Sequence, residues 1–206
     1  MPTRRIALTG GIACGKSLVG DYLRQQGIPV IDADEVVHGM LREDEGLKAN
    51  IRQEFGVAVF DETGGVNRPK LGELVFADTM KRKLVESWIH PKIRETMLSF
   101  FAGHQAQPLV VAIIPLFFES NLEPYYDEVW LLETEEQTRL ERLLQNRGMS
   151  REEALARMKS QMPAEEKRRR AEQCACYHIL NNNGPPDALL RQVEGILAGR
   201  QTVDAV

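Results

Sequence analysis

The sequence predicts an α/β fold built on a mostly parallel, five-stranded sheet with helices on both faces. Short apolar runs alternate along the chain with helical patterns, as they do in successive βα units. These runs are continuously apolar, which is typical of parallel strands buried on both faces. A glycine-rich segment joins the first run to the first helical pattern and therefore places a ligand-binding turn at the sheet.

The expected elements follow in chain order. Strands are expected over residues 5–8, 29–32, 109–114, 128–132 and 177–180. The first helix is expected over residues 17–26. The long gap between the second and third strands contains helical patterns over residues 35–42, 46–55, 70–76 and 79–104, with a short hairpin over 57–66. Pro91 should start or kink a helix there.

The remaining helices have clear end signals. One covers residues 135–147 and ends at Gly148. The next begins with Ser150 as N-cap and Glu153 completing a capping box, and Pro163 opens another. A last helix covers residues 187–198.

Composition limits the class of protein. The chain has 206 residues, with 43% hydrophobic and 27% charged, which suits one globular α/β domain carrying an insertion. A net charge of −4 argues against a general nucleic-acid binder. The longest apolar run, residues 109–118, is too short to cross a bilayer, and no signal peptide is apparent. We therefore expect a cytoplasmic protein with no membrane or nucleic-acid partner. The oligomeric state stays open, and a monomer is compatible with the sequence.

The cysteines give no metal or disulfide pattern. The chain has three, and only one residue separates Cys174 from Cys176. We expect reduced thiols and no zinc site.

Residues 10–17 fit the phosphate-loop pattern G-x-x-x-x-G-K-[ST] between a strand and a helix. Loop amides and the start of the helix form an anion site, to which a lysine adds a point charge and a serine a Mg²⁺ ligand. A cation at a helix N-terminus is poorly placed unless an anion is present. The residues expected to bind nucleotide are Gly11, Ile12, Ala13, Cys14, Gly15, Lys16 and Ser17, with Ser17 as metal ligand.

Two carboxylates, Asp32 and Asp34, end the second expected strand. Ligands of doubly wound sheets bind at the carboxyl ends of the strands. One carboxylate suits a general base that accepts a proton from an attacking hydroxyl, and the other a ligand of Mg²⁺. Helix capping is the competing interpretation, and beside a phosphate loop we favour the base for Asp34.

A basic stretch over residues 139–170 is a candidate lid, because phosphoryl transfer requires cations and exclusion of water. Arg147, at the end of its helix, is the first choice for nucleotide contact, and Arg157 the second. Most of these charges are expected on a solvated face. His90, before Pro91, and Glu119, near a strand end, are each compatible with a site or with a plain surface position.

Several motifs together resemble the dephospho-CoA kinase family. They are residues 7–12 with Gly15-Lys16-Ser17, residues 30–34, Asn67-Arg68 with Leu71, residues 75–78, residues 89–91, residues 114–119, and Asn182-Asn183-Gly184. They occur in order between about residue 6 and residue 198, and the Asp-Ala-Asp and His-Pro pieces are more specific than the phosphate loop.

The resemblance implies a P-loop kinase that transfers the γ-phosphate of ATP to the ribose 3′-hydroxyl of dephospho-CoA, giving CoA and ADP, with ATP as substrate and Mg²⁺ as cofactor. It implies Asp34, Lys16 and Arg147 as catalytic residues, and Asn182, Asn183 and Gly184 near adenine. Asp32, Arg68, His90, Pro115 and Glu119 would line the acceptor side. The implied parts are a nucleotide core (1–34, 108–135, 175–206), a helical acceptor domain (35–107) and a lid (136–174).

The sequence departs from the family pattern inside the phosphate loop. Ala13 and Cys14 stand where Gly-Ser is common. Cys14 places a thiol beside Lys16, so we expect mild oxidation to inhibit and ATP to protect. Two alternatives stay open. One is a kinase acting on a nucleoside monophosphate or a sugar-like acceptor. The other is a nucleotide-dependent switch, although no N-K-x-D motif is present.

Overall fold

A computed structural model describes residues 2–203, with side chains except at residues 76 and 200–203. The chain forms two compact units. Unit 1 comprises Met1–Val30 and His104–Val206, and unit 2 comprises Ile31–Gly103. The division into core, acceptor domain and lid stays a prediction.

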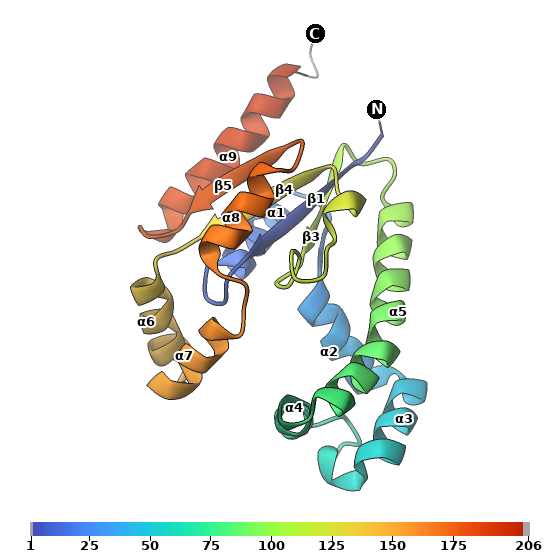
Figure 1. Cartoon of the computed structure of the whole chain (residues 1–206). Helices are drawn as coiled ribbons and strands as arrows, with labels where there is room; N and C mark the ends of the chain where they lie inside the picture. Colours follow the sequence, from blue (N-terminus) through green and yellow to red (C-terminus); the bar gives the residue numbers. More distant parts are fainter. Residues whose placement is uncertain (1, 204–206) are drawn as a thin grey trace. The chain divides into compact units, whose positions relative to one another are not determined.

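The sheet has five strands, β1 (Arg4–Gly10), β2 (Val30–Asp32), β3 (Leu109–Ile113), β4 (Glu128–Glu133) and β5 (Tyr177–Asn181). Their order is β2-β3-β1-β4-β5 (Figure 1). The pairings of β1 with β3, β1 with β4 and β4 with β5 are parallel. Each predicted strand is confirmed, with ends that differ by at most two residues. In β3, all five side chains are buried, as the continuous apolar run predicts.

Unit 1 surrounds the sheet with α1 (Lys16–Gln25), α6 (Glu136–Arg147), α7 (Arg151–Lys159), α8 (Ala164–Glu172) and α9 (Pro186–Val203), plus a short 3₁₀ turn, η2 (Glu123–Tyr125). In Figure 1, α8 lies in front of the strands and α1 behind them. Helices α1 and α9 bury Val19, Leu23, Leu189 and Val193 against apolar side chains of the sheet. This packing fixes the start of α1 at the end of β1.

The predicted end of α6 and the predicted start of α7 are confirmed, whereas α9 runs to Val203 and not to residue 198. Gly148 ends α6 in the left-handed conformation, with φ of 60°, which glycine adopts without strain. Ser150 Oγ accepts the Glu153 N–H, and the Glu153 carboxylate accepts the Ser150 N–H, so the capping box at α7 is complete.

Unit 2 consists of α2 (Ala33–Glu43), α3 (Glu45–Phe55), the 3₁₀ turn η1 (Val57–Val59), α4 (Arg68–Ala77) and α5 (Thr79–Gly103). It has an apolar core of its own, in which Leu47 and Ile51 are fully buried. The predicted insertion is therefore a compact helical unit. No helix among residues 2–203 combines the length and apolar character that crossing a membrane requires.

The structure narrows two local predictions in unit 2. The predicted hairpin over 57–66 is reduced to one antiparallel bridge, Phe60 to Val66, because Asp61 Oδ1 accepts the N–H groups of Thr63 and Gly65 and draws the chain into a turn. Of the two expectations for Pro91, that it starts or that it kinks a helix, the first does not apply, because α5 runs through the proline as the helix predicted over 79–104 requires. Buried side chains on both sides of the proline, Ile89 and Met97, anchor the helix there.

Candidate active site

The phosphate loop joins the last residue of β1, Gly10, to the first residue of α1, Lys16. Gly15 takes φ of 96° and Ala13 takes φ of 62°, so the loop depends on left-handed conformations. The first amides of α1 have no partners within the helix and form an anion site. Lys16 Nζ donates to the carbonyl oxygens of Gly10 and Gly11, both at 2.9 Å, which holds the ammonium group over the loop. The loop thus presents amides and a cation together.

Side chains distant in the sequence support this loop. Arg139 Nε donates to Ile12 O at 3.0 Å, and Arg142 donates to Ala13 O at 3.2 Å and Asn182 O at 3.0 Å. The buried Asn182 donates from Nδ2 to Cys14 O at 2.9 Å. A Cβ on Gly15 would lie 2.3 Å from Asn182 Nδ2, so this position requires glycine. The structure therefore gives Asn182 a loop contact that the sequence analysis missed.

A side chain from the segment between α7 and α8 also reaches the loop. Gln161 Oε1 accepts the Ile12 N–H at 2.8 Å. Because a bound phosphate needs loop amides as donors, it would compete with Gln161 for this one. The contact links the expected lid to the phosphate loop.

A cavity of about 240 Å³ lies along the loop. Gly11, Cys14, Arg139, Lys167 and Asn183 are among the residues that line it. The cavity sits beside the carboxyl end of β4, since Glu133 and Thr134 also line it. This is the position at which doubly wound sheets bind ligands.

The Cys14 thiol is less accessible than the sequence analysis expects. Its residue is 2% exposed, and the side chain belongs to the apolar cluster that contains Ile6 and Val19. Structural thiols buried in apolar surroundings are inert toward oxidants. The structure therefore argues against ready oxidation of Cys14.

Asp32 and Asp34 have different surroundings in unit 2. Asp32 is the N-cap of α2, and its Oδ1 accepts the Asp34 N–H at 2.8 Å. The capping interpretation therefore applies to Asp32. Asp34 lies in the first turn of α2 and is exposed to solvent.

The other predicted residues are distributed over both units. Arg68, at the first position of α4, and His90, within α5, are exposed and belong to unit 2. Pro115 follows β3 in unit 1. Asn183 accepts the Glu135 N–H at 2.8 Å and lies with Gly184 in the loop before α9. Arg147 is exposed at the end of α6, and no hydrogen bond detected within residues 2–203 joins it to the phosphate loop. Among the side chains that the structure describes, the arginines that hydrogen-bond to the loop are Arg139 and Arg142.

This difference leads to a prediction. Arg142→Ala should raise the KM for ATP about tenfold, because the variant loses the hydrogen bonds from the guanidinium group to Ala13 O and Asn182 O. A hydrogen bond to a charged group contributes roughly 1.5–3 kcal/mol. Steady-state kinetics with varied ATP measures the effect. Arg147→Ala is the comparison. If Arg147→Ala raises the KM for ATP and Arg142→Ala does not, then Arg147, the lid arginine predicted from sequence, binds nucleotide and Arg142 does not.

The basic run of α8 is engaged in ion pairs. Lys167 pairs with Glu119 at 2.9 Å, Arg168 with Glu133, Arg169 with Glu166 and Arg170 with Glu123. Lys167 is buried, with a side chain 4% exposed. Three of these four pairs join α8 to other parts of unit 1. These basic side chains therefore hold α8 in place, whereas the sequence predicted a solvated face for most of them.

Glu119 connects the chain after β3 to α8. Its Oε1 accepts the Met162 N–H at 3.0 Å and pairs with Lys167. Burial by itself would raise the pKa of the Glu119 carboxyl, but hydrogen bonds from Lys167 and from backbone amides outweigh it and hold the pKa below its ordinary value of 4.5. Glu119 thus has a structural role whether or not it also contacts an acceptor.

Glu119→Gln should destabilise unit 1 by about 3 kcal/mol at pH 7, since it leaves the Lys167 charge buried without its partner. Folding lowers the pKa of the Glu119 carboxyl below its ordinary value of 4.5. The stabilisation by ionised Glu119 is therefore complete at pH values above 4.5 and is lost as the pH falls through the pKa of the folded protein. The difference in unfolding free energy between wild type and variant should therefore shrink in acid. Denaturant unfolding at several pH values measures it.

Glu166→Gln is the matched control, because it removes the same charge from an exposed pair on α8 and should change nothing measurable. A Glu119 variant as stable as wild type at pH 7 would contradict the structural role.

Comparison with known proteins agrees with this geometry. A model of the dephospho-CoA kinase family matches residues 4–187. A dephospho-CoA kinase of Synechococcus sp. (strain CC9605) is 39% identical over 98% of this chain and 95% of its own length. One from Bacillus cereus is 40% identical over 97% of this chain and 98% of its own length.

Solved structures give the same result. The crystal structure of TT1252 from Thermus thermophilus is 34% identical, with a TM-score of 0.81, and covers 97% of this chain and 98% of its own. Dephospho-CoA kinase from Campylobacter jejuni is 28% identical, with a TM-score of 0.67, over 95% of this chain and 98% of its own. The predicted P-loop kinase fold is thereby confirmed, and the chain belongs to the dephospho-CoA kinase family.

Proposed function

We propose that this protein transfers the γ-phosphate of ATP to the ribose 3′-hydroxyl of dephospho-CoA, producing CoA and ADP, the last step of coenzyme A biosynthesis. The observation that carries the proposal is the family match over residues 4–187 on a chain whose phosphate loop is fully formed. The loop amides and Lys16 are suited to holding the β- and γ-phosphates.

The residues also fit a magnesium ion. The Ser17 hydroxyl is exposed at the start of α1, and no hydrogen bond to it was detected within residues 2–203. Magnesium prefers oxygen ligands and is usually held by one or two protein groups together with substrate phosphates. Ser17 would hold the ion, which when bound neutralises charge on the phosphates.

The chain's own residues would divide the reaction between them. Lys16 stabilises charge on the transferred phosphoryl group, and Asp34 accepts the proton of the attacking hydroxyl. Asn183 and Gly184 lie near adenine, Arg147 belongs to a lid that excludes water, and Arg68, His90 and Pro115 line the acceptor side. This assignment of roles is supported by the family membership and by the chemistry of each group.

Measuring ADP formation from ATP with and without dephospho-CoA tests the proposal. We expect turnover to depend on dephospho-CoA and the product to be CoA. Dominant turnover with a nucleoside monophosphate, and none with dephospho-CoA, would favour another small-molecule kinase. Slow turnover that needs no acceptor and prefers GTP would favour a switch protein.

A further inference from the structure

Three side chains with different donor atoms meet where β4 and β5 begin. They are Glu128, the first residue of β4, Cys176, which directly precedes β5, and His178, within β5. One ligand atom from each lies within 4.8 Å of the other two. His178 Nε2 is 3.2 Å from Glu128 Oε1. The group combines sulfur, nitrogen and oxygen donors.

The strand register explains why these side chains converge. Trp130 is paired with His178 in the parallel ladder, and the Val129 N–H donates to Cys176 O at 3.1 Å. Side chains two residues apart on a strand share a face, so Cys176 and His178 lie on the same side as Glu128 and Trp130. Glu128 lies 48 residues before Cys176 and 50 before His178, a separation that no short spacing motif would reveal.

The separation of the histidine and carboxylate donors suits a tetrahedral ion. Zn–N and Zn–O bonds of about 2.0–2.2 Å at a tetrahedral angle place the two donors about 3.4 Å apart. The observed 3.2 Å between His178 Nε2 and Glu128 Oε1 is close to this separation. Cysteine and histidine favour zinc over magnesium or calcium.

The Glu128 carboxylate supplies negative charge to the cluster. Its side chain is fully buried, while Arg4, at 3.5 Å from its Oε2, is 53% exposed. Trp130 Nε1 donates to Glu128 Oε1 at 2.6 Å, which orients the carboxylate, and His178 Nε2 lies 3.2 Å from the same oxygen. A buried carboxylate is stabilised by an opposite charge beside it.

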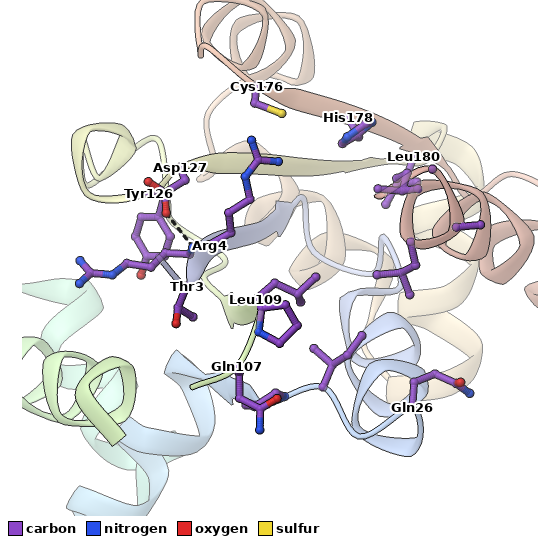
Figure 2. Close-up of a pocket in the computed structure, with 18 of the residues that line it drawn as sticks. Thr3, Arg4, Gln26, Gln107, Leu109, Tyr126, Asp127, Cys176, His178 and Leu180 are labelled. Carbon is purple, nitrogen blue, oxygen red and sulfur yellow. Dashed lines mark hydrogen bonds between the residues drawn. The ribbon is translucent and has the colours of Figure 1, made fainter. Parts of the chain in front are cut away.

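A large cavity gives access to the cluster. Its volume is about 2020 Å³, and Arg4, Cys176 and His178 are among the residues that line it. Figure 2 shows Cys176, just before β5, and His178, within β5, at this cavity. The cavity lies at the amino ends of the strands, since Leu109 and Asp127 also line it. The phosphate loop follows the carboxyl end of β1, so the two sites are separate.

We propose that Glu128, Cys176 and His178 form a zinc-binding site with a fourth position open to the cavity. The proposal differs from the expectation, drawn from cysteine spacing, that the chain has no zinc site. Binding would release the Cys176 thiol proton and replace the direct contact between His178 and Glu128 by two metal bonds. The ion would tie the edge strand β5 to β4.

Metal titration of the full-length protein tests the proposal. Protein stripped of metal with a chelator and then dialysed is titrated with Zn²⁺ in a calorimeter, and separately with Co²⁺ in a spectrophotometer. We expect one ion per chain, a thiolate-to-cobalt charge-transfer band, and the visible absorption of tetrahedral cobalt. Thermal unfolding should shift upward with Zn²⁺, because the ligands are assembled only in the folded chain.

Matched variants assign the ligands. Replacing a residue that only hydrogen-bonds to a metal ligand weakens metal affinity roughly tenfold to hundredfold. Cys176→Ser and His178→Gln each remove a ligand itself and should therefore weaken Zn²⁺ binding by more than this. Cys176→Ser should also abolish the charge-transfer band. Cys174→Ser is the control, since its thiol donates to Arg170 O and is not part of the cluster.

Three outcomes would overturn the proposal. They are the absence of stoichiometric binding, unchanged binding in both ligand variants, and an equal loss in Cys174→Ser. Far-ultraviolet circular dichroism verifies that each variant is folded. Acceptor-dependent ATP turnover of the wild type is measured separately, so that failure of the zinc site and failure of the kinase assignment are distinguished.

Discussion

Asp34→Asn should lower kcat by about 10²–10⁴-fold, the usual contribution of a general base. Asparagine keeps the size of the side chain but cannot accept the proton of the attacking hydroxyl. The affinity for ATP should stay unchanged, because a base acts in the transition state and not in nucleotide binding. Asp34 belongs to unit 2, whereas the phosphate loop belongs to unit 1.

The two aspartates differ in their part in the helix. Asp32 Oδ1 accepts the Asp34 N–H as the cap of α2, and Asp34 itself stands exposed in the first turn. A helix with its cap intact keeps its start in place when Asp34 is replaced. The variant should therefore lose chemistry and retain its fold.

The experiment combines acceptor-dependent turnover with calorimetric titration of ATP. Glu54→Gln, which removes one negative charge from an exposed position on α3, is the control and should behave as wild type. Unchanged turnover in Asp34→Asn would exclude Asp34 as the base. A loss of ATP affinity would assign the carboxylate to nucleotide or metal binding instead.

The strands and most helix ends could be predicted because each depends on a local signal. Continuous apolar runs mark buried parallel strands, and Gly148 and Ser150 mark helix ends through their own backbone preferences. The hairpin predicted at 57–66 is shorter than expected, with one antiparallel bridge, because the Asp61 side chain competes with strand pairing for the amides of the turn. Such competition depends on geometry that turn composition alone does not reveal.

The candidate site was only partly predictable. The phosphate loop is contiguous, so its pattern is visible in the sequence. Its supports are not, since Arg142 lies 129 residues from Ala13 and Asn182 lies 168 residues from Cys14. Arg139 and Arg142 are three residues apart on α6 and therefore share one face of that helix. This spacing was the one signal in the sequence that both arginines could reach the same loop. The burial of Cys14 depends on how α1 packs on the sheet, which the sequence does not specify.

Lys16→Ala should reduce both ATP affinity and turnover, in contrast to Asp34→Asn. The ammonium group contacts phosphate oxygens in the ground state and also stabilises the charge that spreads over the transferred group. Loss of one such preorganised donor costs about 10²–10³-fold in kcat. The KM for ATP should rise as well, because the same charge attracts the bound nucleotide.

The structure adds a requirement to this experiment. Lys16 Nζ also donates to Gly10 O and Gly11 O, so its removal takes away two hydrogen bonds inside the loop. Thermal unfolding must therefore accompany the kinetics. Arg191→Ala, which removes an exposed positive charge from α9, is the control for net charge.

A Lys16→Ala protein that unfolds like wild type, yet binds and turns over ATP poorly, supports the direct phosphate contact. Normal ATP affinity with normal turnover would mean that the loop amides alone hold the phosphates. If instead only kcat falls, Lys16 acts solely in the transition state. If ATP affinity is unchanged in both Lys16→Ala and Asp34→Asn, the backbone amides of the loop and of the first turn of α1 account for nucleotide binding.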